Sequence, residues 1–268
     1  MSDAEMLAGW INVWKQAVDD FVAVLAEIPE AEWSTPTALP GWDVHAVVAH
    51  VAHLEALLAG ARHEDVAIGE PEHVKSSMGT FTEQGVVARR GHTKEQLLDE
   101  IRRSVEVRAR ELDAAPPTDA TAKAPHVFGA IGWDQRTLLR NRPLDVWMHE
   151  QDVRRAVGRP GNLDGPGARH CATYLLESLG VVVAKRAGCP AGTSVVVEVD
   201  GVGTHAVLVD DNGRAQTIEP PADPTVHLAM DVAEHTQLAG GRARPTGIRV
   251  AGDAAVAEQV LAAMAVTP

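Results

Sequence analysis

Residues 142–161 read Arg-Pro-Leu-Asp-Val-Trp-Met-His-Glu-Gln-Asp-Val-Arg-Arg-Ala-Val-Gly-Arg-Pro-Gly and contain Asp145, His149 and Asp152 at helical spacing. At about 100° per residue, offsets of four and seven residues bring these three side chains to one edge of a helix. The same edge adjoins an apolar stripe made of Leu139, Val146, Val153 and Val157. A carboxylate or imidazole facing a core needs a compensating partner, and a metal ion is one way to supply it.

Three further helices are expected before this stretch. Apolar residues recur at spacings of three and four over residues 4–28, the pattern of an amphipathic helix. Residues 43–58 form a second helix with Asp43 as its N-cap, and Thr93-Lys-Glu-Gln is a capping box that opens a charged helix to about residue 114. With a last helix over 134–157, the pattern predicts a four-helix bundle. Residues 60–91 are irregular and predict a long loop with at most one short helix.

The character of the chain changes after Pro166, where β-branched runs bounded by glycine turns begin. The fold class predicted is α+β with two domains, a helix bundle over residues 1–160 and a smaller α+β domain over 161–268. The elements expected in the second domain are helices at 168–187, 231–239 and 254–265 and strands at 193–199, 205–209, 225–230 and 247–250.

Composition excludes several classes of protein. The chain has 268 residues and a formal net charge of -13, which argues against a nucleic-acid partner because such binding is driven by clustered Lys and Arg. We see no signal-peptide pattern, and no apolar run approaches the roughly 18 residues of a membrane span. We therefore expect a soluble cytoplasmic protein without a membrane partner. Arginine is much commoner than lysine, and Ala, Val and Gly are abundant, which is typical of a GC-rich bacterial genome.

The chain lacks the motifs of several common chemistries. Cys171 and Cys189 are its only cysteines and form no Cys-x-x-Cys pair, so redox or zinc-thiolate roles are not expected. No phosphate loop, dinucleotide fingerprint or Gly-x-Ser-x-Gly elbow occurs, so nucleotide cofactors are not supported.

A metal centre is the hypothesis that the sequence favours. His50 lies on an apolar face of the helix predicted for 43–58, and if this helix packs against 134–157, His50 meets Asp145 and His149. Two imidazoles and one carboxylate suit a divalent site with an open position for water or a thiol. Zinc is the default metal, and Fe, Ni, Mn or Co suit the same ligands. The alternative is that each histidine is a hydrogen-bonded core residue.

Residues around the three ligands have supporting roles in this hypothesis. Asp152 either holds a ring nitrogen of a ligand histidine or pairs with Arg155, and His53 is expected to support the ligands without binding the metal itself. His45 is expected either at the surface or in the same supporting role as His53. Trp42 either lines a pocket or packs at a helix junction, while Arg142 falls one turn before the site.

The motifs Leu39-Pro-Gly-Trp-Asp-Val-His-Ala-Val-Val-Ala-His50 and Asp145 to Gly158 resemble the mycothiol-dependent maleylpyruvate isomerase family, within the DinB-like four-helix metalloenzymes. The resemblance implies a DinB-like bundle followed by a smaller domain of sterol-carrier-like topology. It also implies that His50, Asp145 and His149 hold zinc and that mycothiol places its thiol at the open position. From their place beside these ligands, Trp42 and Arg142 are expected to contact this cofactor. The family's isomerases carry Glu where this chain has the shorter Asp145, which bears on metal position and on the reaction.

The chemistry expected from such a site is activation of a low-molecular-weight thiol, because a divalent cation stabilises a thiolate near neutral pH. In an isomerase the thiolate adds to the cis double bond of maleylpyruvate, the single bond rotates, and the thiolate leaves. In an S-transferase the adduct is released. A cation for the substrate's carboxylate or enolate is expected from Arg242 or Arg244.

Two other readings stay open at this point. One is a non-catalytic module that binds a small molecule or a protein and keeps a vestigial metal site. The other is a metal-dependent hydrolase that uses activated water in place of a thiol. The partners expected for the enzyme are mycothiol and a small electrophile, with the chain as a monomer or a homodimer.

Overall fold

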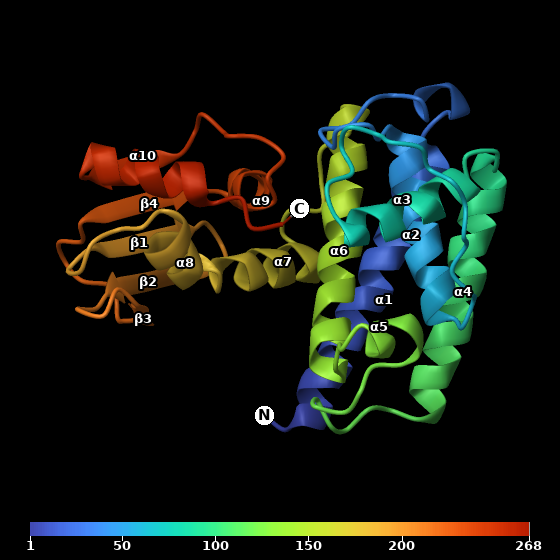
Figure 1. Ribbon diagram of the computed structural model, residues 1–268, viewed down its shortest axis with the longest axis horizontal. Coiled ribbons are helices and arrows are strands. Elements are labelled where there is room, and N and C mark those ends of the chain that lie inside the picture. Colours follow the sequence, from blue (N-terminus) through green and yellow to red (C-terminus); the bar gives the residue numbers. More distant parts are fainter. Residues whose placement is uncertain (268) are drawn as a thin grey trace. The chain divides into compact units, whose positions relative to one another are not determined.

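The computed structural model describes residues 1–267, which form two compact units with their boundary in the chain between Gly161 and Asn162 (Figure 1). The first unit is helical, and the second contains the strands together with further helices. The predicted α+β class is therefore confirmed.

Four long helices build the first unit. Helix α1 packs against α6, and α2 packs against both α4 and α6 (Figure 1). Their bounds agree with the predicted ranges to within one residue at each end: α1 Asp3–Glu27, α2 Val44–Leu58, α4 Lys94–Ala114 and α6 Gln135–Ala156. Every residue of α2 except His45 is buried, so this helix is the centre of the unit.

Side chains just before these helices fix where they begin. Asp43 accepts a hydrogen bond from the Ala46 N–H, and Asp134 accepts one from the Thr137 N–H. Thr93 forms a capping box with Gln96. Such caps satisfy backbone donors that a helix start would otherwise leave unpaired. The caps therefore determine where α2 and α6 begin, and with that which face of each helix carries His50 and His149.

The region predicted as a long loop contains one helix of three turns, α3 (Ser77–Ala88), capped by Ser76 and packed on α2. A short helix that the sequence did not predict, α5 (His126–Ala130), also contacts α2. It contributes Phe128 to an apolar cluster with Leu54, Leu57, Leu58, Ala124 and Leu138. A five-residue helix is too short to leave a periodic pattern, which is why the sequence did not predict it.

The second unit holds a five-stranded sheet in the order β3-β2-β1-β4-β5. Strands β1 and β4 are parallel, and the other pairs are antiparallel. The register places Val197 opposite both His205 and Leu228. The strands are β1 Ser194–Val199, β2 Gly203–Val209, β3 Ala215–Thr217, β4 Val226–Met230 and β5 Arg249–Gly252.

The prediction of one helix over residues 168–187 was wrong. The structure has α7 (Pro166–Leu176), a single turn α8 (Leu179–Val181) and a π-helical segment η2 (Val182–Arg186). The first break lies at Ser178, whose hydroxyl donates to the Leu175 carbonyl at 2.7 Å and competes with the helical hydrogen bonds. The remaining helices are α9 (Val232–Ala239) and α10 (Ala254–Ala263).

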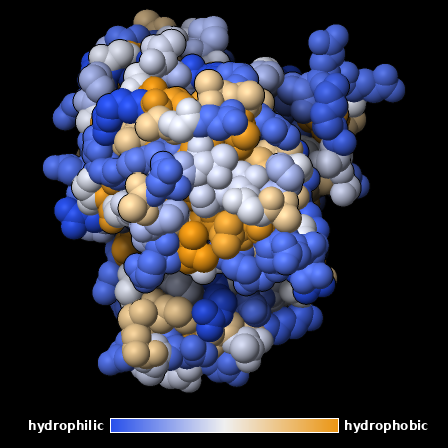
Figure 2. Space-filling model, turned by 90° about the vertical axis from the view of Figure 1, so that its left-hand side faces the viewer, coloured by the Kyte–Doolittle hydropathy of each residue, from blue (hydrophilic) through white to orange (hydrophobic). Residues whose placement is uncertain are grey.

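The surface carries apolar side chains in small areas among hydrophilic ones, as the face in Figure 2 shows. The large apolar side chains that the described part of the chain exposes come from separate elements: Met1, Met78, Ile131, Val181 and Val250. No helix within residues 1–267 has both the length and the apolar character that a membrane span requires.

Candidate metal centre

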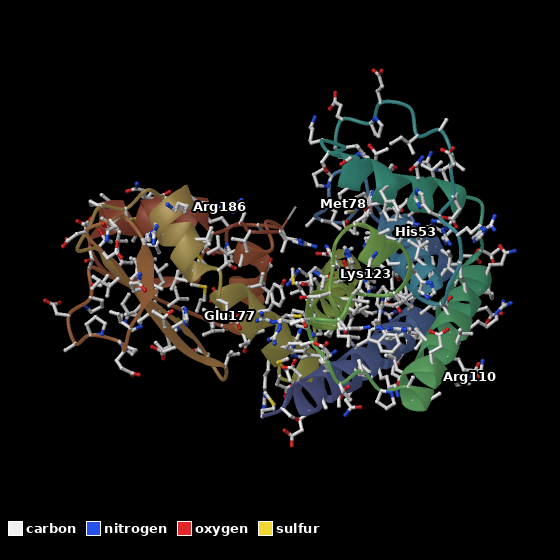
Figure 3. The ribbon with its side chains drawn as sticks, turned by 60° about the horizontal axis from the view of Figure 1, so that its bottom comes forward. His53, Met78, Arg110, Lys123, Glu177 and Arg186 are labelled. Carbon is white, nitrogen blue, oxygen red and sulfur yellow. The ribbon has the colours of Figure 1, made fainter. Side chains whose placement is uncertain are left out.

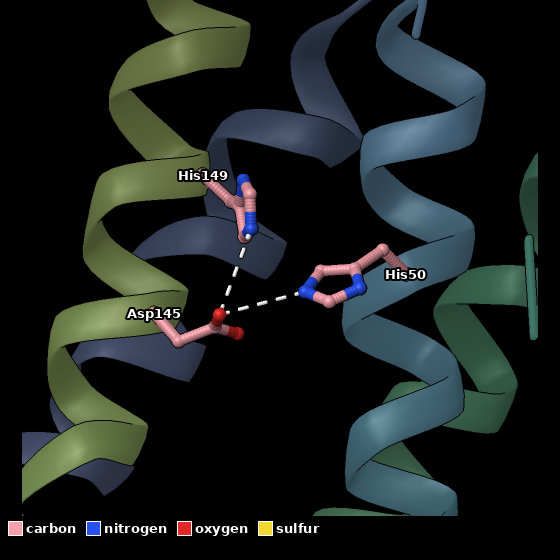
Figure 4. Close-up of side chains that lie close together, drawn as sticks. All are labelled: His50, Asp145 and His149. Atoms are coloured by element: carbon pink, nitrogen blue, oxygen red, sulfur yellow. Dashed lines mark hydrogen bonds and ion pairs between the residues drawn. The ribbon is translucent and has the colours of Figure 1, made fainter. Parts of the chain in front are cut away.

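The structure brings His50 of α2 together with Asp145 and His149 of α6 (Figure 4). The His50 Nε2 lies 3.4 Å from Asp145 Oδ1, and the His149 Nε2 lies 3.7 Å from the same oxygen. The three potential ligand atoms all lie within 4.8 Å of one another. Residues 145 and 149 are one helical turn apart, and the packing of α2 on α6 supplies the third group from across the bundle.

Trp42 packs beside both histidine rings. Its ring centroid lies 5.1 Å from that of His50 and 6.2 Å from that of His149. The indole N–H donates to Glu83 Oε2 at 2.9 Å, which fixes the ring. The residue immediately before the Asp43 cap thus covers one side of the cluster.

Asp145 is held by a chain of ion pairs and hydrogen bonds that connects three helices. Its second oxygen accepts from Arg142 Nη1 at 3.0 Å, and Arg142 Nη2 donates to Glu55 Oε1 at 2.7 Å. Trp14 of α1 donates its indole N–H to the same Glu55 oxygen at 3.2 Å. The structure therefore places Arg142, a predicted mycothiol contact, in the core, where it orients the carboxylate of Asp145.

The electrostatics keep this site in the protonation states that a metal needs. Burial alone would raise the pKa of the Asp145 carboxyl, but Arg142 and the two histidine rings hold that pKa well below its usual range. Burial lowers the pKa of His50. The carboxylate is thus ionised and the His50 ring is neutral at neutral pH.

Asp152 lies where the sequence hypothesis expects a supporting carboxylate. Its Oδ2 lies 3.2 Å from His149 Nδ1, so the Nδ1–H donates to it and the lone pair of His149 is on Nε2, toward Asp145. Arg155 lies 3.8 Å from the other oxygen of Asp152, so the alternative contact is present as well.

The residues fit a divalent metal ion. Two ring nitrogens and one carboxylate oxygen converge, while the second Asp145 oxygen is already bound to Arg142. Within residues 1–267, the buried His50 Nδ1 has no hydrogen-bond partner, which leaves that nitrogen able to carry the ring proton. Three ligands of this kind are typical of open zinc sites, in which a further position remains for a small molecule.

A pocket of about 760 Å³ adjoins the cluster through Trp42, which is part of its wall. The wall comes mainly from the segments that precede α2 and α4 and includes the cationic side chains Arg90 and Lys94. Lys94 donates to the carbonyls of Ala26 and Ile28. The wall also contains the carboxylates of Glu30, Asp43 and Glu83, so the pocket combines aromatic surface with charges of both signs, which suits a small polar molecule.

The other predicted site residues lie elsewhere. His53 faces α3 and the loop before it, where its Nε2 lies 3.1 Å from His63 Nδ1. His45 donates its Nε2–H to the His92 carbonyl at 2.9 Å, away from the three ligands.

The two predicted catalytic arginines belong to the second unit. Arg242 donates to the Gly240 carbonyl at 2.5 Å and to Thr267 Oγ1 at 3.0 Å. Arg244 is half-exposed and makes a two-point contact with Glu258, each bond being 2.5 Å long.

The sequence interpretation missed Glu55 and its contact with Trp14. The signal was present, because Glu55 is the only acidic residue in α2, which is otherwise apolar apart from its histidines. A fully buried carboxylate in such a helix requires a cationic partner.

The fold and the cluster define a helical-bundle protein whose two histidines and one aspartate meet beside a pocket. A family model described as the mycothiol maleylpyruvate isomerase N-terminal domain matches residues 14–154, more than half of the 268 residues. The chain belongs to this family.

Solved structures agree with that assignment at the level of the fold. The crystal structure of the mycothiol-dependent maleylpyruvate isomerase superposes with a TM-score of 0.59 at 15% identity, covering 94% of this chain and 95% of that one. A mutant of that isomerase superposes with a TM-score of 0.58 at 14% identity and the same coverage. A comparison with curated protein sequences gives no match.

Proposed function

We propose that this protein is a mycothiol-dependent metalloenzyme that uses His50, Asp145 and His149 to hold one zinc ion. The observation that carries this proposal is the convergence of these three ligand atoms within 4.8 Å beside a pocket that Trp42 shares with them. Membership of the isomerase family supports the thiol cofactor. The reaction proposed is isomerisation of a maleylpyruvate-type cis double bond, with S-transfer to a small electrophile as the second outcome of the same chemistry.

When bound, the metal would lower the pKa of a thiol so that the thiolate is the nucleophile at neutral pH. The protein's own residues orient the reactants. Arg142 holds one oxygen of Asp145 and so directs the other toward the histidines. Asp152 fixes the ring of His149, and Trp42 shields both rings from one side.

Substrate binding is assigned to cationic groups. Arg90 lies in the pocket wall, and its guanidinium suits the carboxylates of a maleylpyruvate-type substrate. The same role for Arg242 and Arg244 stays a prediction from the sequence. Of the two predicted mycothiol contacts, Trp42 is in the pocket wall, whereas Arg142 acts through Asp145.

The test is zinc content by elemental analysis of untagged protein with no metal added, for the wild type, His149→Ala and His45→Ala. The His45 variant is the matched control, because its ring bonds a carbonyl away from the three ligands. We expect His149→Ala to lose one equivalent of zinc relative to the wild type and His45→Ala to lose none. Equal zinc in the wild type and His149→Ala would overturn the assignment of the metal centre.

Turnover then tests the thiol. The wild type is expected to isomerise maleylpyruvate only when mycothiol is added, and His149→Ala is expected to lose this activity. Hydrolytic turnover without any thiol would favour the hydrolase reading, and zinc binding without turnover of any electrophile would favour the binding module.

A further inference from the structure

A second group of potential metal ligands lies on the side of α2 that faces α3. It consists of His53 of α2 with His63 and Glu64 of the loop that follows α2, and it shares no residue with the first cluster. Figure 3 shows His53 inside the helical unit, whereas the labelled Met78 and Arg110 lie at its periphery. One ligand atom from each of the three residues lies within 4.8 Å of the others.

Hydrogen bonds fix which nitrogen of His63 carries its proton. The side-chain amide of Gln84 donates to Asp65 Oδ1 and to the Val66 carbonyl, both at 3.3 Å. Its oxygen must therefore be the atom that lies 3.0 Å from His63 Nε2, and it accepts the Nε2–H. The lone pair of His63 is thus on Nδ1, directed at His53 Nε2 at 3.1 Å.

Glu64 brings a second acceptor to the same place. Arg89 binds its Oε1 at 2.9 Å, so Oε2 is left facing His53 Nε2 at 3.3 Å. This Oε2 is buried and has no hydrogen-bond partner among the described residues. Arg89 is itself neutralised by a two-point contact with Glu100, so the carboxylate of Glu64 contributes a negative charge to the cluster.

A proton alone does not satisfy this arrangement. If His53 carries its proton on Nε2, that single N–H serves His63 and leaves Glu64 Oε2 without a donor. A second proton on His53 does not help, because it would lie on Nδ1, which is buried without a hydrogen-bond partner among the described residues and is not the nitrogen that faces Glu64. A cation between the three atoms meets all three lone pairs at once, and neutral imidazoles with a carboxylate are ligands that zinc prefers.

The surroundings hold the three groups in place. Phe81 of α3 stacks on His63, with ring centroids 4.0 Å apart and an interplanar angle of 16°. Gly85 of α3 lies so close to His53 that a Cβ there would come within 2.0 Å of the ring. Both contacts come from α3, so the cluster lies where α2, the loop and α3 meet.

We propose that His53, His63 and Glu64 form a second zinc site, separate from the first, which fastens the loop after α2 to the bundle. The loop belongs to the region for which the sequence predicted little regular structure. A metal link to α2 supplies an anchor there that apolar packing does not. The site has three protein ligands, which leaves a fourth position for a water molecule, and the role proposed for it is to anchor the loop.

The first test is metal stoichiometry with cobalt as the probe, because Co²⁺ in such sites absorbs visible light. The chelator-treated full-length wild type is expected to bind two equivalents of Co²⁺, and His63→Ala and His149→Ala one each. The double variant is expected to bind none. If the wild type binds only one equivalent of Co²⁺ and His63→Ala still binds it, the proposal of a second site is overturned and that of the first site stands.

A milder substitution guards against misfolding of His63→Ala. Glu64→Gln is expected to weaken binding of the second equivalent at least tenfold, whereas Glu70→Gln, an exposed carboxylate of the same loop, changes nothing. Equal affinity in Glu64→Gln and Glu70→Gln would overturn the role of Glu64 as a ligand.

Trypsin cleavage at Arg62 reports on the anchoring of the loop. His149→Ala keeps only the second site. In this variant, removal of the metal is expected to speed the cleavage at least tenfold, because metal binding stabilises the loop in its anchored position by mass action. In His63→Ala with His149→Ala the chelator is expected to have no effect. Equal cleavage of metal-loaded and metal-free His149→Ala would overturn the anchoring role.

Discussion

Asp145 has different partners at its two oxygens. Arg142 occupies one oxygen, and the other faces the rings of His50 and His149. Because the guanidinium is buried and also bonded to Glu55, it cannot swing away without leaving a buried carboxylate unpaired. The short aspartate arm is therefore supported by a rigid neighbour, which is the property a ligand carboxylate needs.

Asp152→Asn is expected to lower the zinc affinity of the first centre by about 10–100-fold, because the amide keeps an acceptor for the His149 Nδ1–H but loses its charge. The dissociation constant is measured by competition with a chromophoric chelator. Arg155→Gln removes the other partner of Asp152 and serves as the control, for which we expect a change of less than about threefold. A larger effect in Arg155→Gln than in Asp152→Asn would assign Asp152 to the ion pair instead.

His235 of α9 is fully buried, and both its ring nitrogens lack a hydrogen-bond partner among the described residues. Burial lowers its pKa from 6.5 to about 4. Between these two pH values the unfolded chain binds a proton that the folded chain does not. The free energy of unfolding is therefore highest above pH 6.5 and decreases as the pH drops toward 4. The expected loss is about 3 kcal/mol.

His235→Leu should remove this pH dependence, whereas His205→Leu, at a half-buried position of β2, should keep it. All six tryptophans precede residue 148, so fluorescence does not report on the second unit. Amide hydrogen exchange of residues 162–267 at increasing urea, at pH 4.5 and pH 7, supplies the measurement. Equal pH dependence in the wild type and His235→Leu would rule out this histidine as the cause.

At the scale of elements, α3 approaches α2 closely because it carries glycine at the contact. Gly85 has no space for a side chain beside His53, whereas Gly79 in the same helix has its nearest neighbour 3.4 Å from a built Cβ. The two glycines therefore form a matched pair in one helix.

Gly85→Ala is expected to destabilise the protein by about 1–3 kcal/mol, since either the His53 ring or α3 must move. Gly79→Ala is expected to stabilise it by up to about 1 kcal/mol, because alanine is the better helix former. Urea denaturation followed by tryptophan fluorescence measures the unfolding of the first unit, in which all the tryptophans lie. Similar midpoints for the two variants would contradict the close approach at Gly85.

The sequence predicted elements well where local signals are strong. Caps and apolar periodicity located α1, α2, α4 and α6, because these signals depend on neighbours within a few residues. The sequence missed α5 and β3, which are too short for a periodic pattern, and it joined α7, α8 and η2 into one helix.

The candidate site residues were likewise predicted where they lie on long helices and missed where they lie on a loop. Asp145 and His149 lie on one long helix, so helical spacing was enough to bring them together, whereas the meeting with His50 also required the assumption that two helices pack against each other. His63 and Glu64 lie on a loop without periodicity, and only the tertiary fold brings them to His53. The spacing of residues in the sequence does not show where a loop lies against a helix, which is why the second cluster was not predicted.

At the scale of the whole molecule, both ligand clusters belong to the first unit. Gln151 of α6 donates to the Gly161 carbonyl at 3.1 Å, so the hydrogen bonding of α6 continues to the last residue of that unit. The helical unit thus contains all the residues of both proposed metal sites and an apolar core around α2.

Residues 1–161 produced alone are expected to fold cooperatively and to bind the same number of Co²⁺ equivalents as the full chain. The checks are circular dichroism during thermal unfolding and a cobalt titration, with the full chain as the reference. A helical fragment that binds fewer equivalents would show that the second unit supports the ligands, and an unfolded one would show that it supports the bundle.

The pocket wall and the proposed ligands come from different kinds of segment. Most of the wall belongs to the connectors before α2 and α4, whereas the three ligands are on α2 and α6. Connectors accept insertions and substitutions far more readily than buried helices do. Over evolutionary time such a protein can therefore exchange its substrates by changing the connectors while the helices preserve one chemistry, and divergent descendants would be recognised by their ligands before their pockets.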